Sequence, residues 1–123
     1  GVVYCKLNDL LTRSDIVSIH LNLLNDAKGL IDYNALQKMK LSSILINTSR
    51  GEVIDEDALV SALDKGLIGG AALDVYQEEP YRGQLLKYDN VINTPHIGSY
   101  AREIRMKMEL EAVENLIKGL TNE

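Results

Sequence analysis

Arg50, Glu79 and His96 are the three side chains of this sequence whose chemistry fits a single reaction. An arginine guanidinium binds a carboxylate through two parallel hydrogen bonds, and a histidine donates or accepts a proton near neutral pH. A carboxylate bonded to that histidine orients its ring and favours its protonated form. The set therefore suits the oxidation or reduction of a carbonyl group that stands next to a carboxylate. Taken singly, an arginine after a strand is usually a surface residue and a lone histidine an ordinary loop residue.

Four short segments carry these and related side chains, and each of them follows a run of apolar residues that is typical of a buried strand. In open α/β sheets, ligands bind in the crevice outside the carboxyl ends of the strands. Four polar segments at one edge of a parallel sheet would converge on one site. The segments are Ser18–Leu21, Thr48–Gly51, Asp74 with Glu78–Pro80, and Thr94–Gly98.

Strands and helices alternate along the chain with short connections, which predicts a parallel sheet with right-handed crossovers and an α/β Rossmann-type three-layer fold. Without an internal repeat or linker, residues 1–123 form one domain. The predicted strands are Asp15–Leu21, Ile44–Ile46, Ile68–Val75 and Asn90–Asn93.

The predicted helices are recognised from their capping residues and their apolar spacing. Asp32 is expected to cap a helix from Tyr33 to Lys40, and Asp55 a helix through Leu63 that Gly66 ends in the left-handed conformation. Asn8 would cap a short turn at Asp9–Leu11, and Ser99 a last helix from Tyr100 to about Lys118.

The last helix has an unusual pattern, because its second half shows an apolar face and its first half puts charges on that same side. One interpretation is a core helix whose first half is solvated. The other is that the first half packs against a polar partner outside this chain. The apolar positions are Leu110, Val113, Leu116, Ile117 and Leu120, and the charged ones are Arg102, Arg105 and Glu109.

The composition excludes several classes of protein. A formal net charge of -5 over 123 residues offers no electrostatic surface for nucleic acid. No apolar run approaches the roughly 20 residues that span a bilayer, and the N-terminal residues lack a signal-peptide layout, so we expect a cytoplasmic protein. Cys5 is expected to be a small buried hydrophobe, and His20 and His96 are too far apart in sequence to indicate a metal site.

Three stretches in this order, INTSRGEVIDEDALVSAL, GGAALDVYQEEP and NVINTPHIG, closely resemble the C-terminal half of the NAD-dependent D-2-hydroxyacid dehydrogenases. This is the family of D-3-phosphoglycerate, D-lactate, glycerate and formate dehydrogenases, and the resemblance covers residues 10–120. It implies NAD as cofactor, with NADP not excluded, and a small 2-hydroxy or 2-keto acid as substrate. It also implies a homodimer formed through the nucleotide-binding domain.

By this resemblance Arg50 binds the substrate carboxylate, while Glu79 is the acid that pairs with His96, the proton donor. Hydride would pass between the nicotinamide and C2 of the substrate while His96 supplies or removes a proton. Glu78 competes with Glu79, but the family's acid stands directly before the proline. Asp74 would meet the nicotinamide carboxamide. The other implied cofactor contacts are Leu21, Thr48, Ser49 and Gly98, together with Arg50 and His96.

Two departures from the family pattern are visible. The chain has His20-Leu21-Asn22 where the family usually has His-x-Pro, which removes a fixed φ. None of its nine glycines forms the G-x-G-x-x-G turn that binds the cofactor pyrophosphate. We therefore expect residues 1–123 to be the C-terminal half of the NAD-binding domain, β-α-β-α-β plus a C-terminal helix. The glycine-rich half and the substrate domain would be absent, and the isolated chain inactive. The alternative is a non-catalytic NAD-sensing interaction module of the same fold.

Overall fold

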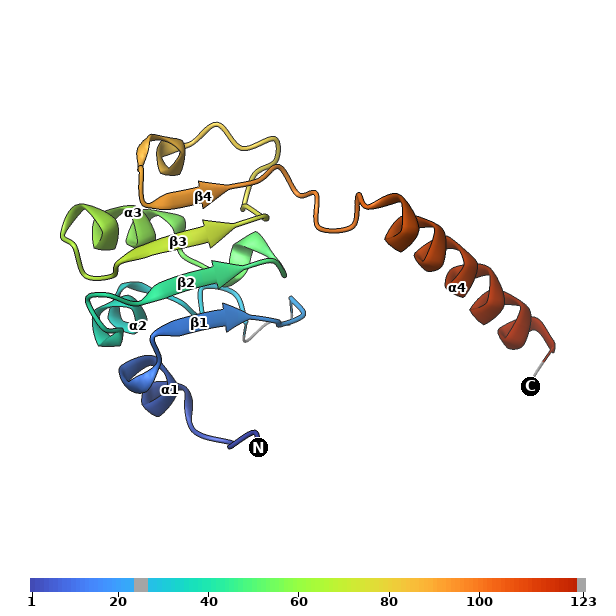
Figure 1. Cartoon of the computed structure of the whole chain (residues 1–123), viewed down its shortest axis with the longest axis horizontal. Coiled ribbons are helices and arrows are strands. Elements are labelled where there is room, and N and C mark those ends of the chain that lie inside the picture. Colours follow the sequence, from blue (N-terminus) through green and yellow to red (C-terminus); the bar gives the residue numbers. More distant parts are fainter. Residues whose placement is uncertain (24–26, 122–123) are drawn as a thin grey trace.

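The computed structural model describes residues 1–23 and 27–121 and contains one four-stranded sheet (Figure 1). The strand order is β1-β2-β3-β4 and all neighbouring pairs are parallel, which confirms the predicted Rossmann-type sheet. The last paired residues, Ile19, Asn47, Leu73 and Asn93, form one row across the sheet, so the four carboxyl ends lie at a common edge. The strands are β1 Ile16–Ile19, β2 Ile44–Asn47, β3 Gly70–Leu73 and β4 Val91–Asn93.

The local signals for the central helices are confirmed. The Asp32 carboxylate accepts a hydrogen bond from the Ala35 N–H at 2.7 Å, and Asp55 accepts one from the Ala58 N–H at 3.0 Å. Gly66 ends a helix with a φ of 63°. The helices are α1 Leu7–Arg13, α2 Tyr33–Lys38, the 3-10 turn η1 Gly51–Val53, α3 Glu56–Asp64, the 3-10 turn η2 Gln84–Lys87, and α4 Arg102–Thr121.

Two predicted caps are wrong. Helix α1 begins at Leu7, so Asn8 lies inside the helix, where its side chain accepts a hydrogen bond from Lys38 at 2.9 Å. Helix α4 begins at Arg102, so Ser99 lies in the preceding loop. At α1 the residue before the helix is Lys6, whose side chain forms no capping hydrogen bond.

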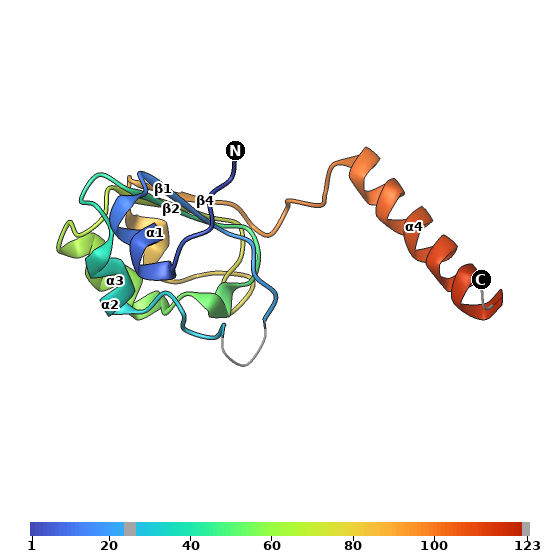
Figure 2. The same ribbon diagram turned by 90° about the horizontal axis from the view of Figure 1, so that it is seen from below.

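Helices α1, α2 and α3 lie on the same side of the sheet (Figure 2). Burial follows this arrangement, because Val17 and Ile19 of β1 are buried while Ile16 is 61% exposed. On β4, Val91 is buried and Ile92 is 68% exposed. Among the described residues, the sheet thus carries one helical layer and an open apolar face opposite it.

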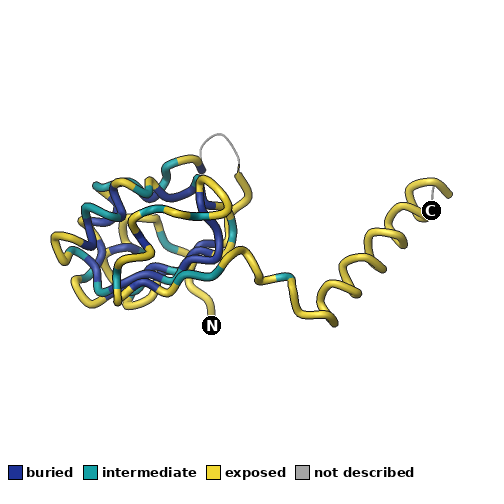
Figure 3. Tube along the Cα trace, turned by 90° about the horizontal axis from the view of Figure 1, so that it is seen from above, coloured by how far each residue is buried: buried dark blue, intermediate teal, exposed yellow. Residues whose placement is uncertain are grey.

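Helix α4 stands away from the sheet and its helices (Figures 1 and 3). None of its residues is buried, and the five apolar side chains of its second half are 55% to 76% exposed. The prediction of a core helix is therefore wrong, because residues 94–101 lead the chain away from the sheet. None of the described helices is long and apolar enough to cross a membrane.

Candidate active site

A buried asparagine, Asn47, shapes the loop that follows β2 and carries Arg50. The Asn47 side-chain oxygen accepts hydrogen bonds from the Ser49 N–H at 3.1 Å and the Ser49 hydroxyl at 3.0 Å. The Asn47 amide donates to the Arg50 carbonyl at 2.9 Å, which closes the turn. Arg50 is exposed, and its Nη1 donates to the Ser49 carbonyl at 2.6 Å. That bond uses one of the five N–H donors of the guanidinium.

Glu79 and His96 face each other from the loops that follow β3 and β4. Glu79 Oε2 lies 2.8 Å from His96 Nδ1, and Glu79 Oε1 accepts the Tyr76 N–H at 3.2 Å. The hydrogen bond with His96 is the main reason why the pKa of Glu79 lies below its ordinary value. Because Nδ1 faces the carboxylate, Nε2 is the ring nitrogen that is left to exchange a proton with a substrate.

The three side chains singled out from the sequence line one open cavity of about 270 Å³. The other residues that line it are Gly51, Glu52, Val75, Tyr76 and Gln77. This arrangement places a carboxylate-binding group beside a proton donor that has its own carboxylate partner. Its chemistry is that of a site for an acid with a neighbouring carbonyl or hydroxyl group.

Asp74 follows β3 and is 7% exposed. Its Oδ1 accepts the Thr94 hydroxyl and the Ile97 N–H, and its Oδ2 accepts the Gly98 N–H at 2.9 Å. Burial acts to raise the pKa of Asp74, but the hydrogen bonds from these three residues outweigh it and lower the pKa. Asp74 thus holds the loop that carries His96, whose φ of 56° is uncommon for a residue other than glycine.

The residues expected to contact a cofactor lie at the same edge of the sheet. Leu21 follows β1 by two residues and is exposed, and Thr48 and Ser49 come directly after β2. Gly98 lies so close to Asp74 that a Cβ on it would be 3.1 Å from the carboxylate. Their roles toward a cofactor stay predictions.

Three supporting roles were missed in the sequence, although Thr94 lies in a segment that was expected to reach the site. Asn47 shapes the Arg50 turn, Thr94 binds Asp74, and the Tyr76 hydroxyl lies 2.9 Å from the Asn93 side-chain oxygen. Asn47 carries a signal, since asparagine directly after an apolar strand favours such turns. Tyr76 carries none, because its partner lies 17 residues away in the chain.

A parallel α/β sheet whose loops assemble a site at the carboxyl edge is the arrangement of nucleotide-binding enzymes. Residues 1–98 match the family described as D-isomer specific 2-hydroxyacid dehydrogenase, NAD binding domain. The chain belongs to this family, which confirms the resemblance seen in the sequence motifs.

Individual relatives agree with this assignment. The chain is 48% identical over 122 residues to the glyoxylate reductase of Thermofilum pendens, covering 98% of this chain and 36% of the relative. It is 48% identical over 122 residues to the glyoxylate/hydroxypyruvate reductase B of Pectobacterium carotovorum, covering 98% and 38%. A solved acyclic imino acid reductase in complex with NADPH and D-Arg superimposes with a TM-score of 0.88 at 34% identity, covering 96% and 38%. The chain therefore spans little more than a third of these relatives.

Proposed function

We propose that the chain supplies the acid-base and carboxylate-binding groups of an oxidoreductase that interconverts small 2-keto and D-2-hydroxy acids with NAD or NADP. The observation that carries the proposal is the 2.8 Å contact between His96 and Glu79 in a cavity that Arg50 also lines. The names of the curated relatives support glyoxylate and hydroxypyruvate as substrates to test first.

Each of the three residues has a separate task in this proposal. Arg50 binds the substrate carboxylate and so orients the neighbouring carbonyl. His96 donates a proton from Nε2 to the carbonyl oxygen in reduction and takes the hydroxyl proton in oxidation. Glu79 fixes the ring through Nδ1 and stabilises its protonated form. When bound, the nicotinamide supplies the hydride in reduction and accepts it in oxidation.

The residues at the sheet edge fit a nicotinamide. Oδ2 of Asp74 accepts one hydrogen bond, from the Gly98 N–H, and a carboxylate oxygen has room for a second donor such as a carboxamide. Thr48 follows β2 and Leu21 follows β1, and both residues are exposed at this edge of the sheet. The family description supports NAD, and the relative solved with NADPH supports NADP as the alternative.

The homodimer that the resemblance implies is a proposal of the same kind. The open apolar face of the sheet, with Ile16 and Ile92, and the exposed apolar side chains of α4 support association.

Turnover tests the proposal in a chimera in which the chain replaces the matched segment of one of the glyoxylate reductases. With glyoxylate and NADH or NADPH, we expect His96→Ala to lower kcat/KM by about 10²- to 10⁴-fold, as loss of a general acid does. Glu79→Gln should also lower it strongly, whereas Glu78→Gln, the adjacent matched control, should leave it near normal. Near-normal turnover of the His96→Ala chimera would refute the roles. A chimera that binds the cofactor but reduces no 2-keto acid would favour the non-catalytic sensing module.

A further inference from the structure

The orientation of the Glu79 carboxylate depends on the backbone of the loop that follows β3. One carboxylate oxygen, Oε1, is held by the Tyr76 N–H at 3.2 Å, and the other, Oε2, faces His96. Glu79 is otherwise exposed. A small displacement of the backbone at residues 76 and 77 would therefore turn the carboxylate away from the histidine.

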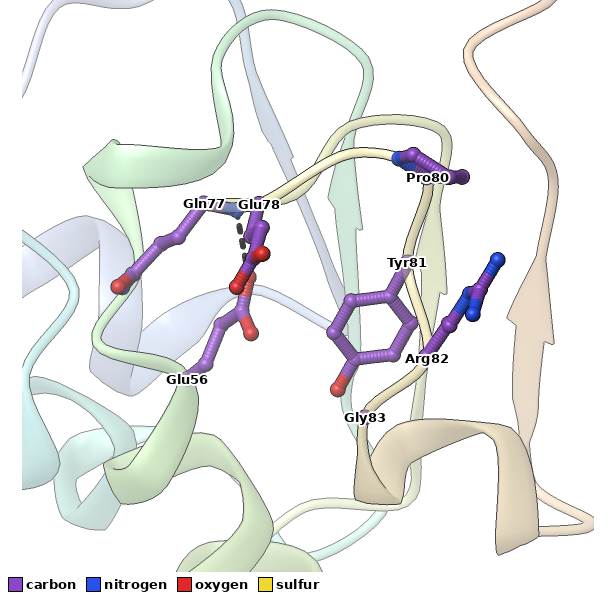
Figure 4. A pocket seen from close by; sticks show the side chains of 7 residues that line it. All are labelled: Glu56, Gln77, Glu78, Pro80, Tyr81, Arg82 and Gly83. Atoms are coloured by element: carbon purple, nitrogen blue, oxygen red, sulfur yellow. Dashed lines mark hydrogen bonds between the residues drawn. The ribbon is translucent and has the colours of Figure 1, made fainter.

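Gln77 ties this loop to the start of α3. Its N–H donates to Glu56 Oε1 at 2.7 Å, and its side-chain amide donates to the Ile54 carbonyl at 2.7 Å. Figure 4 shows the bond between Gln77 and Glu56, with Glu78 on the same side of the loop and Pro80 and Tyr81 farther along it. Two short bonds thus hold the residue next to Tyr76 from both its backbone and its side chain.

The helix on the other side of the Gln77–Glu56 bond is packed into the core. Glu56 is the first residue of α3, a helix that Asp55 caps and that buries Leu59 completely. The backbone of η1 also touches the loop, because a Cβ on Gly51 would lie 2.0 Å from the Tyr76 carbonyl carbon. The segment that starts at Arg50 is therefore braced directly against the segment that ends at Glu79.

We propose that Glu56 is a positioning residue that acts through Gln77 to hold Glu79 against His96. The inference rests on the proposed function for the importance of the Glu79–His96 contact, but the contact itself is measurable without turnover. The competing interpretation is that Glu56 only stabilises α3, as acidic residues in the first turn of a helix do. Asp57 separates the two, since it lies in the same turn, is exposed, and forms no hydrogen bond with this loop among the residues that the structure describes.

The test is the pKa of Glu79, followed by carboxyl carbon NMR in the 123-residue chain. Losing the contacts with His96 and Tyr76 should raise this pKa toward its ordinary value of 4.5. We therefore expect Glu56→Ala to raise it, and Glu56→Gln, whose amide oxygen can still accept the Gln77 N–H, to cause no rise. Simple removal of a negative charge would shift the pKa in the opposite direction, because a nearby negative charge raises a carboxyl pKa.

Asp57→Ala is the matched control and should leave the Glu79 titration unchanged. An unchanged titration in Glu56→Ala, or an equal rise in Asp57→Ala, would overturn the proposal. If Glu56→Ala does not fold, Glu56→Asp decides, since it keeps the negative charge in the first turn of α3 but withdraws the carboxylate from the Gln77 N–H by one methylene. It should also raise the pKa of Glu79, and no rise would count against the proposal. The titration needs neither substrate nor cofactor, so its result can be interpreted even if the chimera shows no turnover. An unchanged titration would equally leave the roles of Glu79 and His96 intact.

Discussion

The sheet with α1–α3 and the separate helix α4 contain similar apolar side chains in opposite surroundings. Leu45 of β2 and Leu59 of α3 have no exposed surface, whereas Leu116 of α4 is 62% exposed. Figure 3 shows the same contrast along the whole trace. An apolar period identifies the face of a helix that is suited to burial, but another element must cover that face before it contributes to stability.

The largest expected effect on stability comes from truncating a leucine to alanine in each of the two regions. Leu59→Ala should lower the free energy of unfolding by about 2–5 kcal/mol, because it leaves a cavity in a fully packed site. Leu116→Ala should change it by less than about 0.5 kcal/mol, as an exposed substitution does. Urea unfolding followed by circular dichroism measures both. A loss of similar size in Leu116→Ala would show that α4 is covered in solution and would break the comparison.

Substitution of two glycines by alanine should change stability by smaller amounts, with a loss in the sheet region and a gain in α4. Gly51→Ala would bring its Cβ within 2.0 Å of the Tyr76 carbonyl carbon, so the two loops must separate, at a cost of about 1–3 kcal/mol. Gly119→Ala in α4 meets no atom within 4 Å and should stabilise the helix by about 0.5–1 kcal/mol. Thermal unfolding detects the first change and helical circular dichroism the second. Equal unfolding temperatures for Gly51→Ala and wild type would contradict the close packing of the loops.

The elements that local chemistry dictates could be predicted from the sequence. Asp32 and Asp55 cap α2 and α3 as expected, and Gly66 adopts the left-handed conformation. Each of these depends on residues within one helical turn, so the chain itself carries the information. The common edge of the sheet follows from the same local patterns, because parallel strands with short crossovers bring their carboxyl ends together.

Contacts between distant segments could not be predicted in this way. Glu56 binds Gln77 across 21 residues, and no local pattern announces that pair. The pairing of an acid with His96 was expected because their segments converge at one edge of the sheet. The choice of Glu79 over Glu78, however, came only from the resemblance to a family in which the acid stands directly before the proline. The exposure of α4 was missed for the same physical reason, since its amphipathic pattern says nothing about which surface covers it.

The smallest expected difference in stability between the two regions concerns a buried carboxylate, Asp74, and an exposed one, Glu109 of α4. The pKa of Asp74 lies below its ordinary value of 3.8 because three hydrogen bonds outweigh the effect of burial. Its contribution to stability is therefore fully present above pH 3.8 and is lost as the pH falls through its lower folded-state value. Glu79, whose pKa is also lowered, adds a loss that begins below its ordinary value of 4.5.

Asp74→Asn should lower the unfolding temperature at neutral pH, because an amide cannot accept all three bonds, and should flatten the decline at acid pH. In α4, Glu109 forms an exposed bond with Arg105 at 3.1 Å, and Glu109→Gln should cost at most about 0.5 kcal/mol of helix stability. Thermal unfolding from about pH 7 to pH 3 covers the acid range in which folded carboxylates take up protons. An acid decline in Asp74→Asn as steep as in wild type would mean that the His96 loop is held by other contacts. The buried carboxylate would then matter no more than its exposed counterpart in α4.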